Sequence, residues 1–160
     1  MFVYIIRHGE AHNDSDSGRD RDRELTELGH RQAWAAGAYL AGLGYGVKGS
    51  LLVVASPFTR AQETGIEVCN ELGIELKTDD LLGADYGLTE MLSVVESHSD
   101  QQAIAIVSHM PTVGMFETML TGGITERAGS LLTGQVVKVR VDPDELVGSG
   151  EVVDRYRLES

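Results

Sequence analysis

The chain has 160 residues, enough for one hydrophobic core, and its 42% hydrophobic and 24% charged residues are ordinary for a globular protein. Its formal charge of −12 argues against nucleic acid or an anionic membrane as the main partner, although a few arginines can still bind a small anion. The single cysteine excludes an internal disulfide, and no signal peptide or membrane-spanning run is recognisable, so we expect one cytoplasmic domain over residues 1–160.

The first part of the chain predicts a strand, a long loop, a helix and a second strand. Phe2–Ile6 is rich in β-branched and aromatic residues, which favours a buried strand. The polar stretch His12–Glu24 lacks apolar periodicity, and a loop of that length is usually functional or mobile. Thr26 is expected to cap a helix that ends in the glycine-rich run Gly42–Gly49, and Leu51–Ala55 predicts another buried strand.

The remainder of the chain alternates in the same way. Apolar residues at helical spacing predict three more helices, Phe58–Leu72, Leu88–Ser97 and Thr112–Leu120. Short apolar or alternating runs predict four more strands, Ile74–Leu76, Ala103–Val107, Ser130–Val141 and Val152–Leu158. Because strands and helices alternate and no repeat or linker divides the chain, we expect a layered α/β fold.

Three of the predicted strands end in similar chemistry. The first is followed by Arg7-His8-Gly9, the second by Ser56 with Arg60 shortly after it, and the third by Ser108-His109. Ligands of open α/β sheets bind outside the carboxyl ends of the strands. Parallel strands would therefore gather Arg7, His8, Arg60 and His109 at one rim. Two arginines and two histidines around one point suit phosphate or another dianionic oxyanion.

Three further residues are candidates for binding the same group. Gly9 lets the backbone approach a ligand closely, and Ser56 precedes a helix start that offers backbone N–H donors. Arg23 belongs to the charged run Arg19–Glu24, which is either a self-neutralising solvated segment or a source of one more cation for the site. The spacing within His8–His12 fits no zinc motif, so we expect neither a metal nor a cofactor.

The ordered motifs resemble those of the histidine phosphatase superfamily, which also includes the phosphoglycerate mutases. The matching segments are Arg7-His8-Gly9, Leu25–Gly29, Ser56–Thr64 and Ser108–Gly114, and the resemblance extends to about Leu120. The longer strings are similar to the SixA branch, the phosphohistidine phosphatases. The resemblance implies a phosphoglycerate mutase-like fold, with three α/β/α layers and a mixed, mostly parallel sheet flanked by helices.

The resemblance also implies a metal-independent mechanism. His8 would be the nucleophile and become transiently phosphorylated, while Arg7, Arg60 and His109 would hold the phosphoryl oxygens. Arginines can supply the positive charge that phosphoryl transfer needs, since catalysis of this reaction is mostly positioning and charge stabilisation.

A carboxylic acid to protonate the leaving group is not obvious in the sequence. Glu10, Asp85 and Glu90 are possible acids, and each is otherwise a solvated loop carboxylate. A missing acid suits a phosphohistidine substrate, because its leaving imidazole is protonated more readily than an alkoxide. We therefore expect a phosphatase acting on a signalling protein, such as a histidine phosphotransfer domain or a sugar-transport phosphocarrier. The alternatives are a small-molecule phosphomonoester phosphatase and a non-catalytic phosphate-recognition module.

Overall fold

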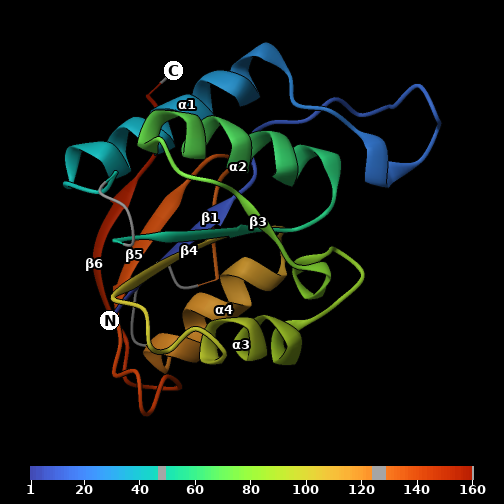
Figure 1. The fold of residues 1–160 in the computed structure, drawn as a ribbon. Coiled ribbons are helices and arrows are strands. Elements are labelled where there is room, and N and C mark those ends of the chain that lie inside the picture. Colours follow the sequence, from blue (N-terminus) through green and yellow to red (C-terminus); the bar gives the residue numbers. More distant parts are fainter. Residues whose placement is uncertain (47–49, 124–128, 160) are drawn as a thin grey trace.

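A mixed sheet lies between two layers of helices (Figure 1). The structure is a computed structural model and describes residues 1–46, 50–123 and 129–159. Within them the strands are β1 (Phe2–Arg7), β2 (Leu52–Ala55), β3 (Lys77–Thr78), β4 (Ala103–Ser108), β5 (Val136–Arg140) and β6 (Glu151–Tyr156). The helices are α1 (Glu27–Gly42), α2 (Thr59–Leu72), α3 (Leu88–Glu96) and α4 (Thr112–Thr121), with short 3₁₀ turns η1 (Asp20–Asp22) and η2 (Asp80–Leu82).

The strand order is β3-β2-β4-β1-β5-β6. The four strands from β3 to β1 are mutually parallel, whereas β5 is antiparallel to both β1 and β6. Helices α1 and α2 cover one face and α3 and α4 the other (Figure 1). The predicted three-layer fold with a mixed, mostly parallel sheet is thus confirmed.

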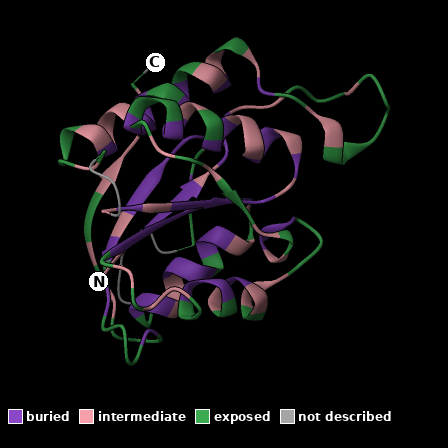
Figure 2. Ribbon diagram, in the orientation of Figure 1, coloured by how far each residue is buried: buried purple, intermediate pink, exposed green. Residues whose placement is uncertain are grey.

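Alternate residues of the central strands supply the two halves of the core. In β1, Val3 and Ile5 join the cluster that includes Phe116 of α4, whereas Tyr4 and Ile6 join the cluster that includes Leu40 of α1. This alternation follows from the period of two in a strand, and helices on both sides make both faces apolar. Figure 2 shows the central strands buried and the outer helix faces exposed. No helix in the described ranges is long and apolar enough to span a bilayer.

Several predicted boundaries differ from the structure. The strand predicted at Ile74–Leu76 is wrong, because these residues lead away from the left-handed Gly73 and their apolar side chains pack into the core beside α2. The edge strand is instead β3, which pairs with the end of β2. The strand predicted over Ser130–Val141 begins only at Val136, after a turn. Gly49, the last glycine of the run predicted to end the first helix, lies outside the described residues.

The start of α1 is pressed against the end of β1. Thr26 caps the helix as predicted, because its Oγ1 accepts a hydrogen bond from the Gly29 N–H at 3.0 Å. A Cβ on Gly29 would lie 2.0 Å from the Glu10 carbonyl oxygen, and one on Gly9 would lie 2.5 Å from the Gly29 carbonyl oxygen. Only glycines permit this backbone contact, which fixes the segment just after His8.

We expect Gly29→Ala to destabilise the protein by about 2 kcal/mol or more, because the added methyl group overlaps rigid backbone. Gly42→Ala in the same helix is the control, since a Cβ there would meet no atom within 4 Å. The control should be neutral or slightly stabilising, in line with helix propensity. Urea unfolding of both variants measures the difference, and similar midpoints would contradict the proposed contact.

Candidate active site

The carboxyl ends of three neighbouring parallel strands meet at one rim of the sheet. The last residue of β1, Arg7, lies opposite Ser108, the last residue of β4. On the other side of β4, β2 leads directly into Ser56. The imidazoles that follow β1 and β4 belong to His8 and His109, and their ring centroids are 5.3 Å apart. The strand topology therefore gathers the predicted histidines at this rim.

The tautomer of His8 follows from its contacts. Its Nδ1 lies 2.7 Å from the carbonyl oxygen of Gly9. A carbonyl oxygen can only accept, so Nδ1 carries the proton and Nε2 keeps its lone pair. Burial lowers the pKa of His8 to about 4, with Arg60 and Arg7 adding to the shift and the Gly9 bond opposing it. At neutral pH the ring is uncharged and its Nε2 is nucleophilic.

Arg60 directs its guanidinium at the same nitrogen. It is the second residue of α2 and is 5% exposed. Its Nε donates to His8 Nε2 at 3.3 Å. Burial lowers the pKa of Arg60, Asp20 opposes that shift, and the guanidinium stays charged because of its high intrinsic value. A fixed positive charge therefore lies beside the unprotonated nitrogen of His8.

Arg60 also binds the predicted loop. Its Nη1 donates to the backbone oxygen of Asp20 at 2.9 Å, and its Nη2 lies 3.2 Å from Asp20 Oδ2. Arg23 Nε lies 2.9 Å from Asp20 Oδ1. Partial burial raises the pKa of the Asp20 carboxyl, but the hydrogen bonds and charges of Arg23 and Arg60 outweigh burial and lower it. Asp20 is thus an ionised carboxylate between two arginines.

Arg7 is held from the opposite side of the rim. Its Nη1 donates to the carbonyl oxygen of Leu131 at 3.0 Å. Its Nε is buried and has no hydrogen-bond partner among the described residues. Burial, and then the charge of Arg157, lowers the pKa of Arg7. Arg7 thus keeps one buried donor that no described residue uses.

Ser56 orients His109. The Ser56 hydroxyl oxygen accepts a hydrogen bond from the Phe58 N–H at 3.1 Å and lies 2.8 Å from His109 Nε2. Burial, then the neighbouring His8 and Arg60, lowers the pKa of His109 to about 3. The serine hydroxyl has one proton and a second lone pair, so it can pair with Nε2 in either tautomer of His109. Within the described residues the buried Nδ1 of His109 has no partner.

A second set of side chains supports the backbone around His8. Thr64 Oγ1 accepts from the Gly9 N–H at 3.0 Å and donates to the Arg60 carbonyl oxygen at 2.7 Å. Gln62 Nε2 donates to the Ser56 carbonyl oxygen at 2.7 Å. Sequence reasoning assigned no role to Thr64 or Gln62, although both lie in the Ser56–Thr64 string that carries the resemblance.

The candidate acids lie outside this cluster. Glu10 Oε1 accepts from the Thr26 hydroxyl at 3.0 Å. Asp85 is exposed and lines a hollow of about 170 Å³ together with Arg21, Pro57, Asp80 and Tyr86. Glu90 belongs to the first turn of α3. Among the described residues none of these three carboxylates hydrogen-bonds to His8 or His109.

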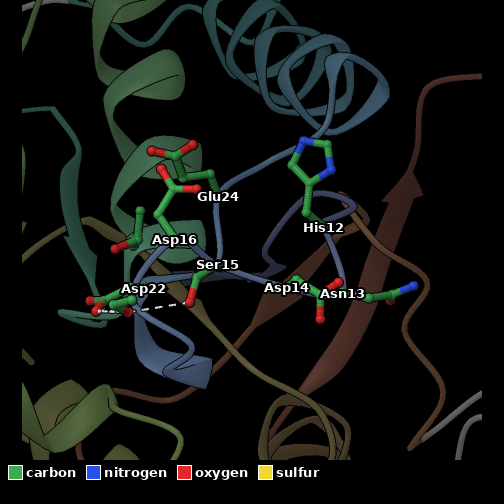
Figure 3. Close-up of a pocket in the computed structure, with 9 residues that line it drawn as sticks. His12, Asn13, Asp14, Ser15, Asp16, Asp22 and Glu24 are labelled. Carbon is green, nitrogen blue, oxygen red and sulfur yellow. Dashed lines mark hydrogen bonds between the residues drawn. The ribbon is translucent and has the colours of Figure 1, made fainter.

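A separate hollow of about 800 Å³ lies along the loop that precedes α1 (Figure 3). It is lined by His12, Asn13, Asp14, Ser15, Asp16, Ser17, Asp22, Glu24 and Thr59. Its carboxylates repel phosphate, so this hollow does not suit the predicted ligand. No group of three or more His, Cys, Asp or Glu side chains in the described part of the chain is placed to hold a metal ion.

Comparison with known proteins agrees with the geometry. A sequence model of the histidine phosphatase superfamily (branch 1) matches residues 3–105. The phosphohistidine phosphatase SixA homolog of Haemophilus influenzae is 33% identical over 131 residues, which cover 76% of this chain and 78% of that protein. Phosphohistidine phosphatase SixA of Escherichia coli is 28% identical over 146 residues, 89% and 86% of the two chains.

The fold has a counterpart among solved structures. The structure of the protein histidine phosphatase SixA complexed with tungstate superposes with a TM-score of 0.83, at 24% identity, over 98% of this chain and 97% of the other. At that identity the match establishes a shared fold.

Acid should destabilise the protein through its two buried imidazoles. An unfolded histidine has a pKa of roughly 6.5, whereas the folded values are about 4 for His8 and about 3 for His109. Below pH 6.5 the unfolded chain binds more protons, so the free energy of unfolding falls with pH until the folded values are reached. Urea unfolding should show a smaller loss from pH 7.5 to pH 5 in His8→Asn than in wild type. Equal losses would contradict the assignment of a neutral, buried His8.

Proposed function

The chain belongs to the histidine phosphatase superfamily and is a phosphatase, and we propose that it removes the phosphoryl group from phosphohistidine on a protein, with His8 as acceptor. The carrying observation is the fixed tautomer of His8, whose Nε2 is unprotonated and faces Arg60 at 3.3 Å. We further propose that residues 1–160 act as a single histidine phosphatase domain.

The first step is attack by His8 Nε2 on phosphorus, in line with the bond to the substrate imidazole. The bond from Nε2 to phosphorus forms while the substrate's nitrogen–phosphorus bond breaks, and the leaving imidazole takes a proton from solvent. His8 Nδ1 keeps its proton and its bond to the Gly9 carbonyl. That carbonyl dipole stabilises the positive charge that develops on the phosphorylated ring.

We propose that four side chains bind the phosphoryl oxygens. They belong to Arg7, Arg60, Arg23 and His109. The charges of the three arginines lower the pKa of His8. The His109 ring lies 5.3 Å from the His8 ring, and its Nδ1 has no partner among the described residues. Because the transition state is loose, most catalysis comes from positioning and from fixed donors. Loss of one such donor commonly costs about 10²–10³ in rate.

The second step is hydrolysis of phosphorylated His8. A water oxygen bonds to phosphorus, the bond to Nε2 breaks, and the electron pair returns to Nε2 while the water protons stay with phosphate and solvent. The lowered pKa of His8 favours this release, because the neutral ring that leaves is the stable form in its buried site. The cycle ends with the tautomer that began it.

Among the described residues no carboxylic acid hydrogen-bonds to His8 or His109, and this supports phosphohistidine as the substrate. Asp20, the carboxylate bound to Arg60, has a lowered pKa and is ionised at neutral pH, so it is a poor acid. Glu10 is engaged by Thr26. An imidazole leaving group needs less help than an alkoxide. The names of the two SixA relatives agree with this substrate class, and a histidine phosphotransfer domain or a phosphocarrier is the proposed partner.

His8→Ala should abolish turnover and acid-labile labelling of the chain by a ³²P-phosphohistidine protein, because it removes the acceptor nitrogen. His98→Ala is the matched control, since His98 lies after α3 and outside the site, and should keep both properties. Labelling that persists in His8→Ala would overturn the role proposed for His8.

The wild-type protein should prefer a phosphohistidine protein over alkyl phosphates by at least about 10² in kcat/KM, because alkoxide leaving groups depend more on a general acid. Initial rates of phosphate release at one pH and ionic strength give the ratio. A preference for alkyl esters, with labelling of His8 retained, would leave the nucleophile intact and overturn only the substrate assignment.

A further inference from the structure

We propose that Asp20 competes with the phosphoryl group for Arg60 and Arg23 in the resting site and that a substrate binds by displacing it, which makes Asp20 a specificity residue. The proposal rests on the proposed function, because it concerns the same arginines. Its starting point is a carboxylate from the loop that bridges Arg60 and Arg23 beside the nucleophile.

All three nitrogens of Arg60 are engaged in the resting site. Nε donates to His8 Nε2 at 3.3 Å, Nη1 donates to the Asp20 backbone oxygen at 2.9 Å, and Nη2 lies 3.2 Å from Asp20 Oδ2. A phosphoryl group transferred to His8 Nε2 needs donors from this same fork. Asp20 and the phosphoryl group therefore compete for the guanidinium of Arg60.

The second oxygen of Asp20 makes the competition stronger. Oδ1 lies 2.9 Å from Arg23 Nε, so the carboxylate joins two arginines in the way that two phosphoryl oxygens can. Arg23 itself is held by the His12 carbonyl oxygen, to which its Nη1 donates at 2.7 Å. The resting site is closed by an internal anion that imitates part of the ligand.

Asp20 is positioned to move, whereas Arg60 is not. The Asp20 side chain is 63% exposed and that of Arg60 only 6%. The bonds that organise the loop, from Ser17 and Arg19 to Asp22, are also exposed. Exposed ion pairs contribute little to stability, so the loop can yield without unfolding the core around His8.

The charges decide which ligands can enter. Asp20 carries one negative charge, whereas a phosphoryl group carries about 1.5 to 2 and offers three acceptor oxygens. A phosphoryl group therefore outcompetes Asp20 for the arginines, while a carboxylate or another monoanion gains no advantage over it. Asp20 thus makes the arginines selective for dianions. Arginines without this internal carboxylate would also bind the monoanionic carboxylates that are abundant in a cell.

Asp20→Asn removes the competing charge and keeps the backbone oxygen and the shape. The control is Asp22→Asn, which makes the same charge change in the same turn, where Asp22 binds Arg19 and Ser17 and not Arg60. Isothermal titration with inorganic phosphate, at fixed pH and ionic strength, measures binding without any turnover. We expect Asp20→Asn to bind phosphate about three- to tenfold more tightly than wild type, and Asp22→Asn to match wild type.

The outcomes separate this proposal from the proposed function. Unchanged or weaker phosphate binding by Asp20→Asn, or equal gains in both variants, would overturn displacement of Asp20. Turnover adds a second readout, because displacement predicts a lower KM with kcat retained, whereas a structural role for Asp20 predicts a lower kcat. Arg60→Ala tests the site itself, since phosphate affinity retained in that variant would contradict the proposed function whatever Asp20→Asn shows.

Discussion

The hydrogen bond from His8 Nδ1 to the Gly9 carbonyl, at 2.7 Å, governs the chemistry of the rim. It fixes which nitrogen is protonated, and thereby leaves Nε2 as the atom that faces Arg60. The donor from Arg60 Nε acts in the same direction, because it disfavours the tautomer with a proton on Nε2. Burial acts in the same direction, because it keeps the ring neutral at physiological pH.

The fold holds that bond through backbone contacts rather than through long side chains. The Gly9 N–H donates to the Thr64 hydroxyl of α2, and a Cβ on Gly9 would overlap the Gly29 backbone of α1. The segment after β1 is therefore enclosed by the two helices on one face of the sheet. A rigid backbone placed in this way fixes the carbonyl direction, which a flexible loop would not do.

The gathering of the candidate site residues at one rim follows from the sequence because each of them ends a strand or begins a helix. Arg7, His8, Arg60 and His109 could be brought together from strand order alone, since the carboxyl ends of parallel strands share one edge. The position of Asp20 could not be predicted, because nothing in the run Arg19–Glu24 distinguishes an aspartate that binds Arg60 from one that stays in solvent. The strand prediction for Ile74–Leu76 was wrong for another reason. Apolar residues that pack beside a helix have the same composition as a short strand.

Burial of four basic groups at one rim has a cost that the site must offset. Desolvation lowers the pKa values of both histidines, which are therefore neutral, and of Arg7 and Arg60, which stay charged, so the two arginines would be more stable with an anion beside them. Asp20 supplies that anion for Arg60 from the exposed side, while Arg7 Nε and His109 Nδ1 have no hydrogen-bond partner among the described residues. A phosphoryl group carries more negative charge than a carboxylate and offers three acceptor oxygens, so it suits this pair of arginines better. The same desolvation that keeps His8 neutral therefore favours binding of an anion beside the two arginines.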